Sequence, residues 1–181
     1  MHYNQYQNHP VSMNLIDLLC SEGVAQVKPL FSENTIKHWN ALLDPAFAKQ
    51  NAPRKYVSAI ELLDMGLLNE IFNEQMLGII FKLIPDAELY HCHVYEINGN
   101  NKEPHIKANN QLSGWHRDTD CKFRFFTPKP QHISIFVYLS DVSSTGGCFE
   151  LTNKPLTFLP TGFKDEVYYK LIGQAGTSFL F

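Results

Sequence analysis

The stretch GWHRDTD, residues 114–120, decides how the fold and the chemistry of this chain are interpreted. A β-strand points residues two apart to the same face, so His116 and Asp118 would offer an imidazole nitrogen and a carboxylate oxygen to one cation. Both groups belong to the two-histidine, one-carboxylate set that binds non-haem Fe(II) and leaves coordination positions open. The motif therefore predicts a metal site at His116 and Asp118 that needs a second histidine from elsewhere in the chain.

The composition limits the classes of protein to which the chain can belong. The chain has 181 residues, 44% apolar and 13% aromatic, which is enough to bury a core and predicts a single domain. The formal charge of -3 argues against a nucleic-acid partner, and no apolar run approaches the roughly 18 residues of a membrane span. The polar N-terminus does not read as a signal peptide, and we expect a cytoplasmic protein with reduced thiols because the cysteines form no C-x-x-C pair. The cysteines are Cys20, Cys92, Cys121 and Cys148.

The region 14–86 reads as mainly helical and follows a loose tail over residues 1–13. One helix is expected to begin after Ser32, a residue type that caps helices, and to end at Asp44-Pro45. The polar residues 46–56 are expected to form a loop.

The strongest helical pattern covers residues 67–84, where one wide apolar stripe runs up to Pro85. A single helix is expected there, packing its stripe onto a sheet. Before it, a short helix over 15–20 and a first strand over 24–29 are expected.

The region 87–181 changes to short strands separated by turns. The clearest strand covers 132–142, with aliphatic side chains such as Ile135 and Val137 on one face and Phe136 on the other. Helices followed by many short strands predict an α+β, mainly β protein whose strands form a sandwich or barrel. Further strands are expected over 88–97, 148–152, 156–159, 167–172 and 177–181.

Several stretches of the chain together resemble the phytanoyl-CoA dioxygenase family. They are residues 89–97, Pro104-His105, GWHRD at 114–118, 133–142 and GGCFEL at 146–151. The resemblance implies a double-stranded β-helix, the cupin-like jelly roll, with N-terminal helices packed on the larger sheet. It also implies Fe(II)- and 2-oxoglutarate-dependent hydroxylation of an unactivated C–H bond in a small-molecule substrate, with His116 and Asp118 as iron ligands.

The same resemblance carries two further residues over to a role beside the 2-oxoglutarate cosubstrate. Tyr95 lies on the strand before the motif, on the face that also carries His91 and His93, and Phe136 lies on the non-aliphatic face of the strand after it. An ordinary core aromatic is the alternative for each.

The chain departs from the family at its C-terminal end. It has no histidine after His132 and no arginine after Arg124, so the family's distal histidine and its 2-oxoglutarate-binding arginine are missing. The apolar strand 177–181 is expected to lack pairing partners, which favours a truncated piece whose β-helix lacks its last strands. The alternative is a non-catalytic jelly-roll protein that has lost these residues and binds a ligand or a partner.

A third hypothesis recruits other histidines as metal ligands. His91 and His93 share a face and would replace the distal histidine in a cupin-type site, and His105 or His132 is a further substitute. Asp120 is a candidate hydrogen-bond acceptor that would hold a metal ligand in place. Arg117 and Arg124 are candidate partners for an anionic substrate or cosubstrate. Ordinary solvated or surface-paired side chains are the alternative for these three.

Overall fold

The computed structural model describes residues 15–97, 132–151 and 169–181. It has the α+β architecture expected from the sequence. The helices are α1 (Leu15–Glu22), α2 (Glu33–Ala48), α3 (Ala59–Asp64), α4 (Leu67–Ile71) and α5 (Glu74–Leu83). The strands are β1 (Ala25–Val27), β2 (Arg54–Ser58), β3 (His93–Ile97), β4 (Ile135–Val137), β5 (Phe149–Leu151), β6 (Tyr169–Leu171) and β7 (Ser178–Leu180). None of the helices in these ranges is long and apolar enough to cross a membrane.

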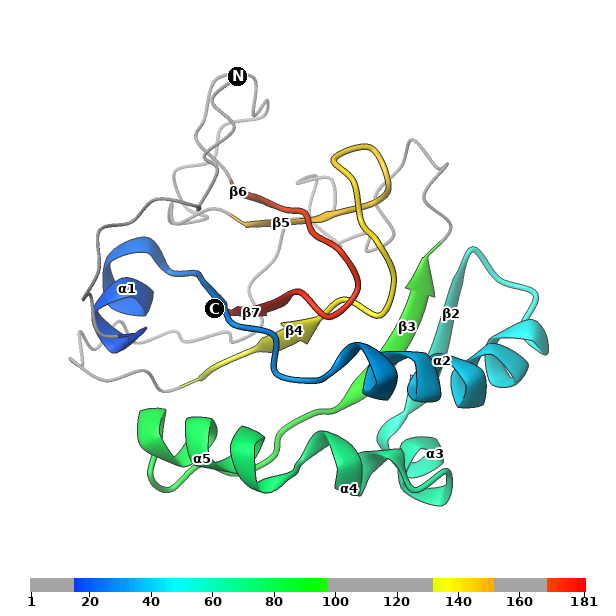
Figure 1. Cartoon of the computed structure of the whole chain (residues 1–181), viewed down its shortest axis with the longest axis horizontal. Coiled ribbons are helices and arrows are strands. Elements are labelled where there is room, and N and C mark those ends of the chain that lie inside the picture. Colours follow the sequence, from blue (N-terminus) through cyan, green and yellow to red (C-terminus); the bar gives the residue numbers. More distant parts are fainter. Residues whose placement is uncertain (1–14, 98–131, 152–168) are drawn as a thin grey trace.

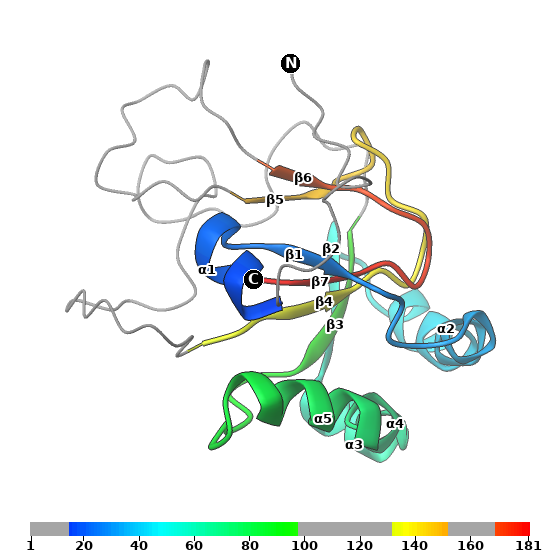
Figure 2. The same cartoon turned by 60° about the vertical axis from the view of Figure 1, so that its left-hand side comes forward.

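The strands of the described ranges form antiparallel groups, which Figure 1 shows together with the helices. β7 lies between β1 and β4 in the largest group, β2 pairs with β3, and β5 pairs with β6. Helices α3, α4 and α5 lie on one side of the largest group and the β5–β6 pair lies on the other, in Figure 1 and in Figure 2. The largest group is therefore a middle layer between helices and a second β layer.

The last strand, β7, is the central strand of its sheet. Leu180 lies opposite both Ala25 of β1 and Ile135 of β4, and all residues of β7 are buried. The expectation that the apolar strand 177–181 lacks pairing partners is therefore wrong. One partner comes from close to the N-terminus, a long-range pairing that the local pattern of the strand does not reveal.

Helix α2 begins at a capping serine, as expected, but continues past its proline. The Ser32 hydroxyl accepts a hydrogen bond from the Thr35 N–H at 3.1 Å. Pro45 lies inside the helix, so the expected end at Asp44-Pro45 is wrong. An interior proline costs a helix about 3 kcal/mol, and burial of the Phe47 side chain returns about 1.5–3 kcal/mol. Because these contributions nearly cancel, packing of the buried face can override the local stop signal.

Residues 46–56, expected to be a loop, contain the end of α2 and the beginning of β2. The Gln50 side chain joins the two elements: its amide nitrogen donates to the Tyr56 carbonyl oxygen at 2.8 Å. Its own side-chain oxygen accepts from the Tyr56 N–H at 2.8 Å. The Gln50 backbone N–H also donates to the Phe47 carbonyl oxygen in α2 at 3.0 Å, so this polar residue connects the helix to the strand.

The apolar stripe over 67–84 forms α4 and α5 instead of the single helix expected. Phe72 leaves the helical conformation, and Asn73 then caps α5 by accepting a hydrogen bond from the Met76 N–H at 3.0 Å. An asparagine stabilises a helix start by about 1 kcal/mol relative to alanine, whereas inside a helix its amide competes with the backbone. The break leaves the apolar stripe intact; its buried members are Leu67, Met76 and Leu83.

Strand β4 separates two apolar clusters. On one face, Ile135 and Val137 pack against the helical cluster that contains Trp39 and Leu43. Leu139, just after the strand, packs there too. Phe136 and Tyr138 point the other way and pack against Leu171 of β6 and Phe179 of β7. The alternation expected over 132–142 is confirmed, although the strand itself covers only Ile135–Val137. We call the side that carries Phe136, Tyr138 and Phe179 the inner face.

Candidate functional site

The antiparallel pair β2–β3 supplies most of the candidate site. Its register places Tyr56 opposite Tyr95, and Arg54 and His93 share their face because they lie two residues away along the same strands. The opposite face carries Val57, which is buried in the helical cluster. One face of the pair therefore carries Val57 and Val94 beside the Lys55–Glu96 ion pair, and the other face carries the aromatic side chains and Arg54.

A row of rings connects this face of β2–β3 with the inner face of β4. The His93 ring lies between Tyr56 and Tyr95, with centroid separations of 5.0 and 5.4 Å and an interplanar angle of 27° to each. Tyr95 meets Phe136 edge-on with centroids 6.0 Å apart, and Phe136 continues to Phe149 of β5 at 4.7 Å. We call these five residues the aromatic row. The two residues that the resemblance places beside a cosubstrate thus contact each other.

The His93 imidazole is neutral at physiological pH. Burial of the ring, together with repulsion from His91 and from Arg54, lowers the pKa of His93 from 6.5 to about 4. A neutral imidazole offers one nitrogen as an acceptor or metal ligand and the other as a donor.

Arg54 is a half-buried cation that lies against the aromatic row. Its guanidinium carbon is 4.7 Å from the centroid of the Tyr95 ring, a cation–π contact. Its Nε atom is buried and has no hydrogen-bond partner within the described ranges. The Tyr138 hydroxyl on the inner face differs: it donates to the Leu171 carbonyl oxygen at 2.5 Å and accepts from the Phe149 N–H at 3.4 Å. Arg54 is therefore the polar group here whose bonding capacity the described residues leave unused.

His91 lies beside His93, with ring centroids 4.4 Å apart, and its Nε2 atom is 3.2 Å from the Tyr56 hydroxyl. His132 lies by Tyr90, with ring centroids 6.2 Å apart, and Tyr90 also contacts His91, with centroids 6.5 Å apart. In the part of the chain that the structure describes, no three His, Cys, Asp or Glu side chains gather as metal ligands. A cupin-type site on His91 or His93 would thus need ligands from the remaining residues.

The predicted metal ligands His116 and Asp118 lie outside the described residues. The other candidates that also lie outside them are His105, Asp120, Arg117 and Arg124. Their roles stay predictions from the sequence.

The sequence pattern does not single out Arg54 or Tyr56, because both lie in a polar stretch between a proline and a helix. A signal is nevertheless present in the letters RKYVS at 54–58, where β-branched Val57 follows the aromatic Tyr56 directly before Ser58. Ser58 then caps α3 in a capping box with Glu61. A short strand that ends at a helix cap is therefore the sequence signal that could have identified β2.

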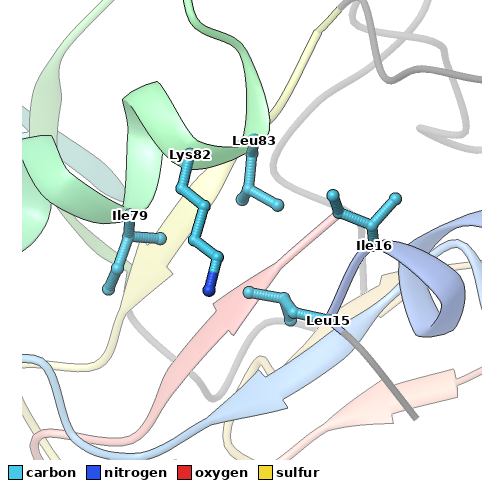
Figure 3. A pocket seen from close by; sticks show the side chains of 5 residues that line it. All are labelled: Leu15, Ile16, Ile79, Lys82 and Leu83. Atoms are coloured by element: carbon cyan, nitrogen blue, oxygen red, sulfur yellow. The ribbon is translucent and has the colours of Figure 1, made fainter.

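A small cavity of about 130 Å³ lies between α1 and α5 and is separate from this site (Figure 3). Its lining is aliphatic apart from the Lys82 side chain. The lining residues are Leu15, Ile16, Ile79, Lys82 and Leu83, and none belongs to the aromatic row.

Comparisons with known proteins give no relative: no family model, curated protein or solved structure matches the chain. Function is therefore inferred from the residues and from the described geometry.

Proposed function

We propose that the protein is an Fe(II)- and 2-oxoglutarate-dependent dioxygenase that hydroxylates an unactivated C–H bond of a small-molecule substrate, or a piece of such an enzyme. His116 and Asp118 support this proposal, because their spacing suits two ligands of one metal ion. The resemblance of the surrounding stretches to the phytanoyl-CoA dioxygenase family supports it further. Among described contacts, the ring contact between Tyr95 and Phe136 carries the most weight, since both are placed beside the cosubstrate by that resemblance.

The chemistry of the described face fits such a site. Bound iron would supply the activation of O2 that couples decarboxylation of 2-oxoglutarate, to succinate and CO2, with hydroxylation of the substrate. Tyr95 and Phe136 would border the cosubstrate and limit the access of water to it. Arg54 offers a positive charge beside Tyr95. The neutral His93 ring adds a donor and an acceptor without adding a second cation.

We also propose that the sheets belong to a double-stranded β-helix. The β5–β6 pair lies over the sheet that contains β4, and Phe149 and Phe136 touch across the two layers. Helices cover the opposite face of β4. Both features are compatible with a jelly roll whose larger sheet is packed against N-terminal helices.

The experiment measures metal binding and succinate formation with the full chain. Anaerobic titration with Fe(II), or with Mn(II) as a redox-stable probe, is expected to show one site that is lost in His116→Ala and in Asp118→Ala. After addition of O2, the wild type is expected to convert 2-oxoglutarate to succinate and both variants are not. His38→Gln is the matched control, because the His38 side chain is 54% exposed on α2. Succinate release that survives His116→Ala contradicts the assignment.

The same titration separates the alternatives. A wild-type chain that binds neither metal favours the non-catalytic jelly-roll protein that binds a ligand or a partner. Metal binding that is lost on His91→Gln or His93→Gln favours the cupin-type site.

A further inference from the structure

Arg54 has hydrogen-bonding capacity that its described neighbours leave unused. Its guanidinium lies against the Tyr95 ring, 4.7 Å from the centroid. All N–H bonds of a guanidinium lie in its plane, and a cation–π contact does not use them as hydrogen-bond donors to oxygen. The Nε atom is buried and has no hydrogen-bond partner among the described residues. An acceptor in that plane would satisfy it.

The described neighbours also leave the charge of Arg54 unbalanced. The acidic residue of β3, Glu96, lies opposite Lys55 and forms an ion pair with the Lys55 ammonium group. Lys55 is adjacent to Arg54 in β2, so the strand points it to the opposite face. No described carboxylate forms an ion pair with Arg54. A half-buried cation without a counter-ion favours binding of an anion.

The number and shape of the groups indicate which anion fits. Arg54 is the one strong cation among the described side chains of the aromatic row and its face, because His93 there is neutral. A carboxylate carries one negative charge and is planar, so it can accept two parallel bonds from Nε and a terminal nitrogen of one arginine. A phosphate group carries a charge closer to two and is matched less well by a single guanidinium.

We infer that Arg54, held against Tyr95, binds a carboxylate group of a small organic acid. The inference rests on the proposed function for the identity of that acid, which would be 2-oxoglutarate. The two halves of the site would be joined by Tyr95, which contacts both Arg54 and Phe136.

The test is calorimetric titration of the iron-free full chain with succinate and with 2-oxoglutarate, using uncharged succinamide as the negative control. Both acids are expected to bind the wild type and succinamide is not. Arg54→Gln is expected to weaken binding of both acids by about tenfold or more, and Arg54→Lys by less, because lysine keeps the charge but loses the fork. Lys55→Gln is the matched control: it removes the neighbouring positive charge from the opposite face and is expected to leave binding unchanged.

A measurement on the wild type covers the case in which Arg54→Gln fails to fold. The Arg54 Nε–H resonance, assigned by comparison with Arg54→Lys, is expected to shift on addition of succinate and to stay in place on addition of succinamide. The inference is overturned if the wild type and a folded Arg54→Gln bind succinate equally. It is also overturned if the Nε–H resonance does not shift on addition of succinate. Arg54-dependent binding without any succinate production from 2-oxoglutarate would sink the proposed function and leave the carboxylate site standing. Succinate production that is unchanged in Arg54→Gln would overturn the carboxylate site and leave the proposed function in place.

Discussion

Acidification is expected to destabilise the protein through His93. The pKa of His93 is lowered from 6.5 to about 4 in the folded protein, and the unfolded chain has the ordinary value. At pH 5 nearly every unfolded molecule carries a proton on this ring, whereas only about one folded molecule in ten does. The unfolded state therefore binds more protons, and the free energy of unfolding falls as the pH falls from about 6.5 towards 4.

The size of this effect follows from the same pKa difference. A fall from 6.5 to about 4 corresponds to roughly 3.4 kcal/mol for a fully shielded ring. The His93 ring is only half-buried and solvent screens its charge, so about half of that, roughly 1.5 kcal/mol, is expected. About 1 kcal/mol of it would be lost between pH 7 and pH 5, because most of the proton uptake by the unfolded chain is complete there.

Urea unfolding at pH 7 and pH 5 measures the loss in the wild type and in His93→Gln, which cannot take up the proton. The variant is expected to show a pH dependence smaller by about 1 kcal/mol. NMR titration of the imidazole carbon-bound protons gives the pKa directly, with a midpoint for His93 near 4. His91→Gln is expected to raise that midpoint, because it removes one source of repulsion. A midpoint near 6.5, or identical pH dependence in wild type and His93→Gln, would refute the described packing of this ring.

Other predictions concern the elements that hold the site. Phe179→Ala, in the central strand β7 at 3% exposure, is expected to lower the free energy of unfolding in urea by about 3–5 kcal/mol, and a cost under about 1 kcal/mol would contradict its burial. Trp39→Phe removes a 2.7 Å bond from the indole Nε1 to the Glu70 carboxylate and also part of a buried ring, so it is expected to lower the free energy of unfolding in urea by about 1–3 kcal/mol; in Glu70→Gln, by contrast, the amide oxygen can keep the bond and the ring stays in place. Asn73→Ala removes the cap of α5 and is expected to cost about 1 kcal/mol, whereas Asn69→Ala, exposed within α4, is the control with little effect; equal costs would argue against the helix break.

The sequence predicts a helix end or a strand face correctly where a few neighbouring residues determine it. Ser32 caps α2 because its hydroxyl reaches an N–H three residues later, a relation visible in the sequence. The alternation around Phe136 predicts the two faces of β4, because successive side chains of a strand point to opposite faces. The same spacing placed Tyr95 and His93 on one face, and their stacked rings confirm it.

Tertiary packing decides the features that the sequence alone does not give. Helix α2 runs through Pro45 because burial of Phe47 offsets the proline. Asn73 breaks an apolar stripe that reads as continuous, and its capping role depends on the conformation of the preceding residue. Arg54 belongs to the candidate site only through the pairing of β2 with β3, two strands that lie far apart in the sequence. No local pattern specifies such a pairing.

Strand β7 connects the stability of the sheet with the geometry of the candidate site. Its residues alternate in direction, yet Ser178, Phe179 and Leu180 are all buried, as expected for a strand covered on both faces. The residue after it, Phe181, stacks on Phe149 at 5.1 Å and lies 5.6 Å from Phe136. Phe136 is thus held from two sides, by β5 and by the end of β7, while its edge contact with Tyr95 is the link to Arg54. A change at the end of the chain would therefore reach the proposed carboxylate site through the orientation of Phe136, without touching Arg54 itself.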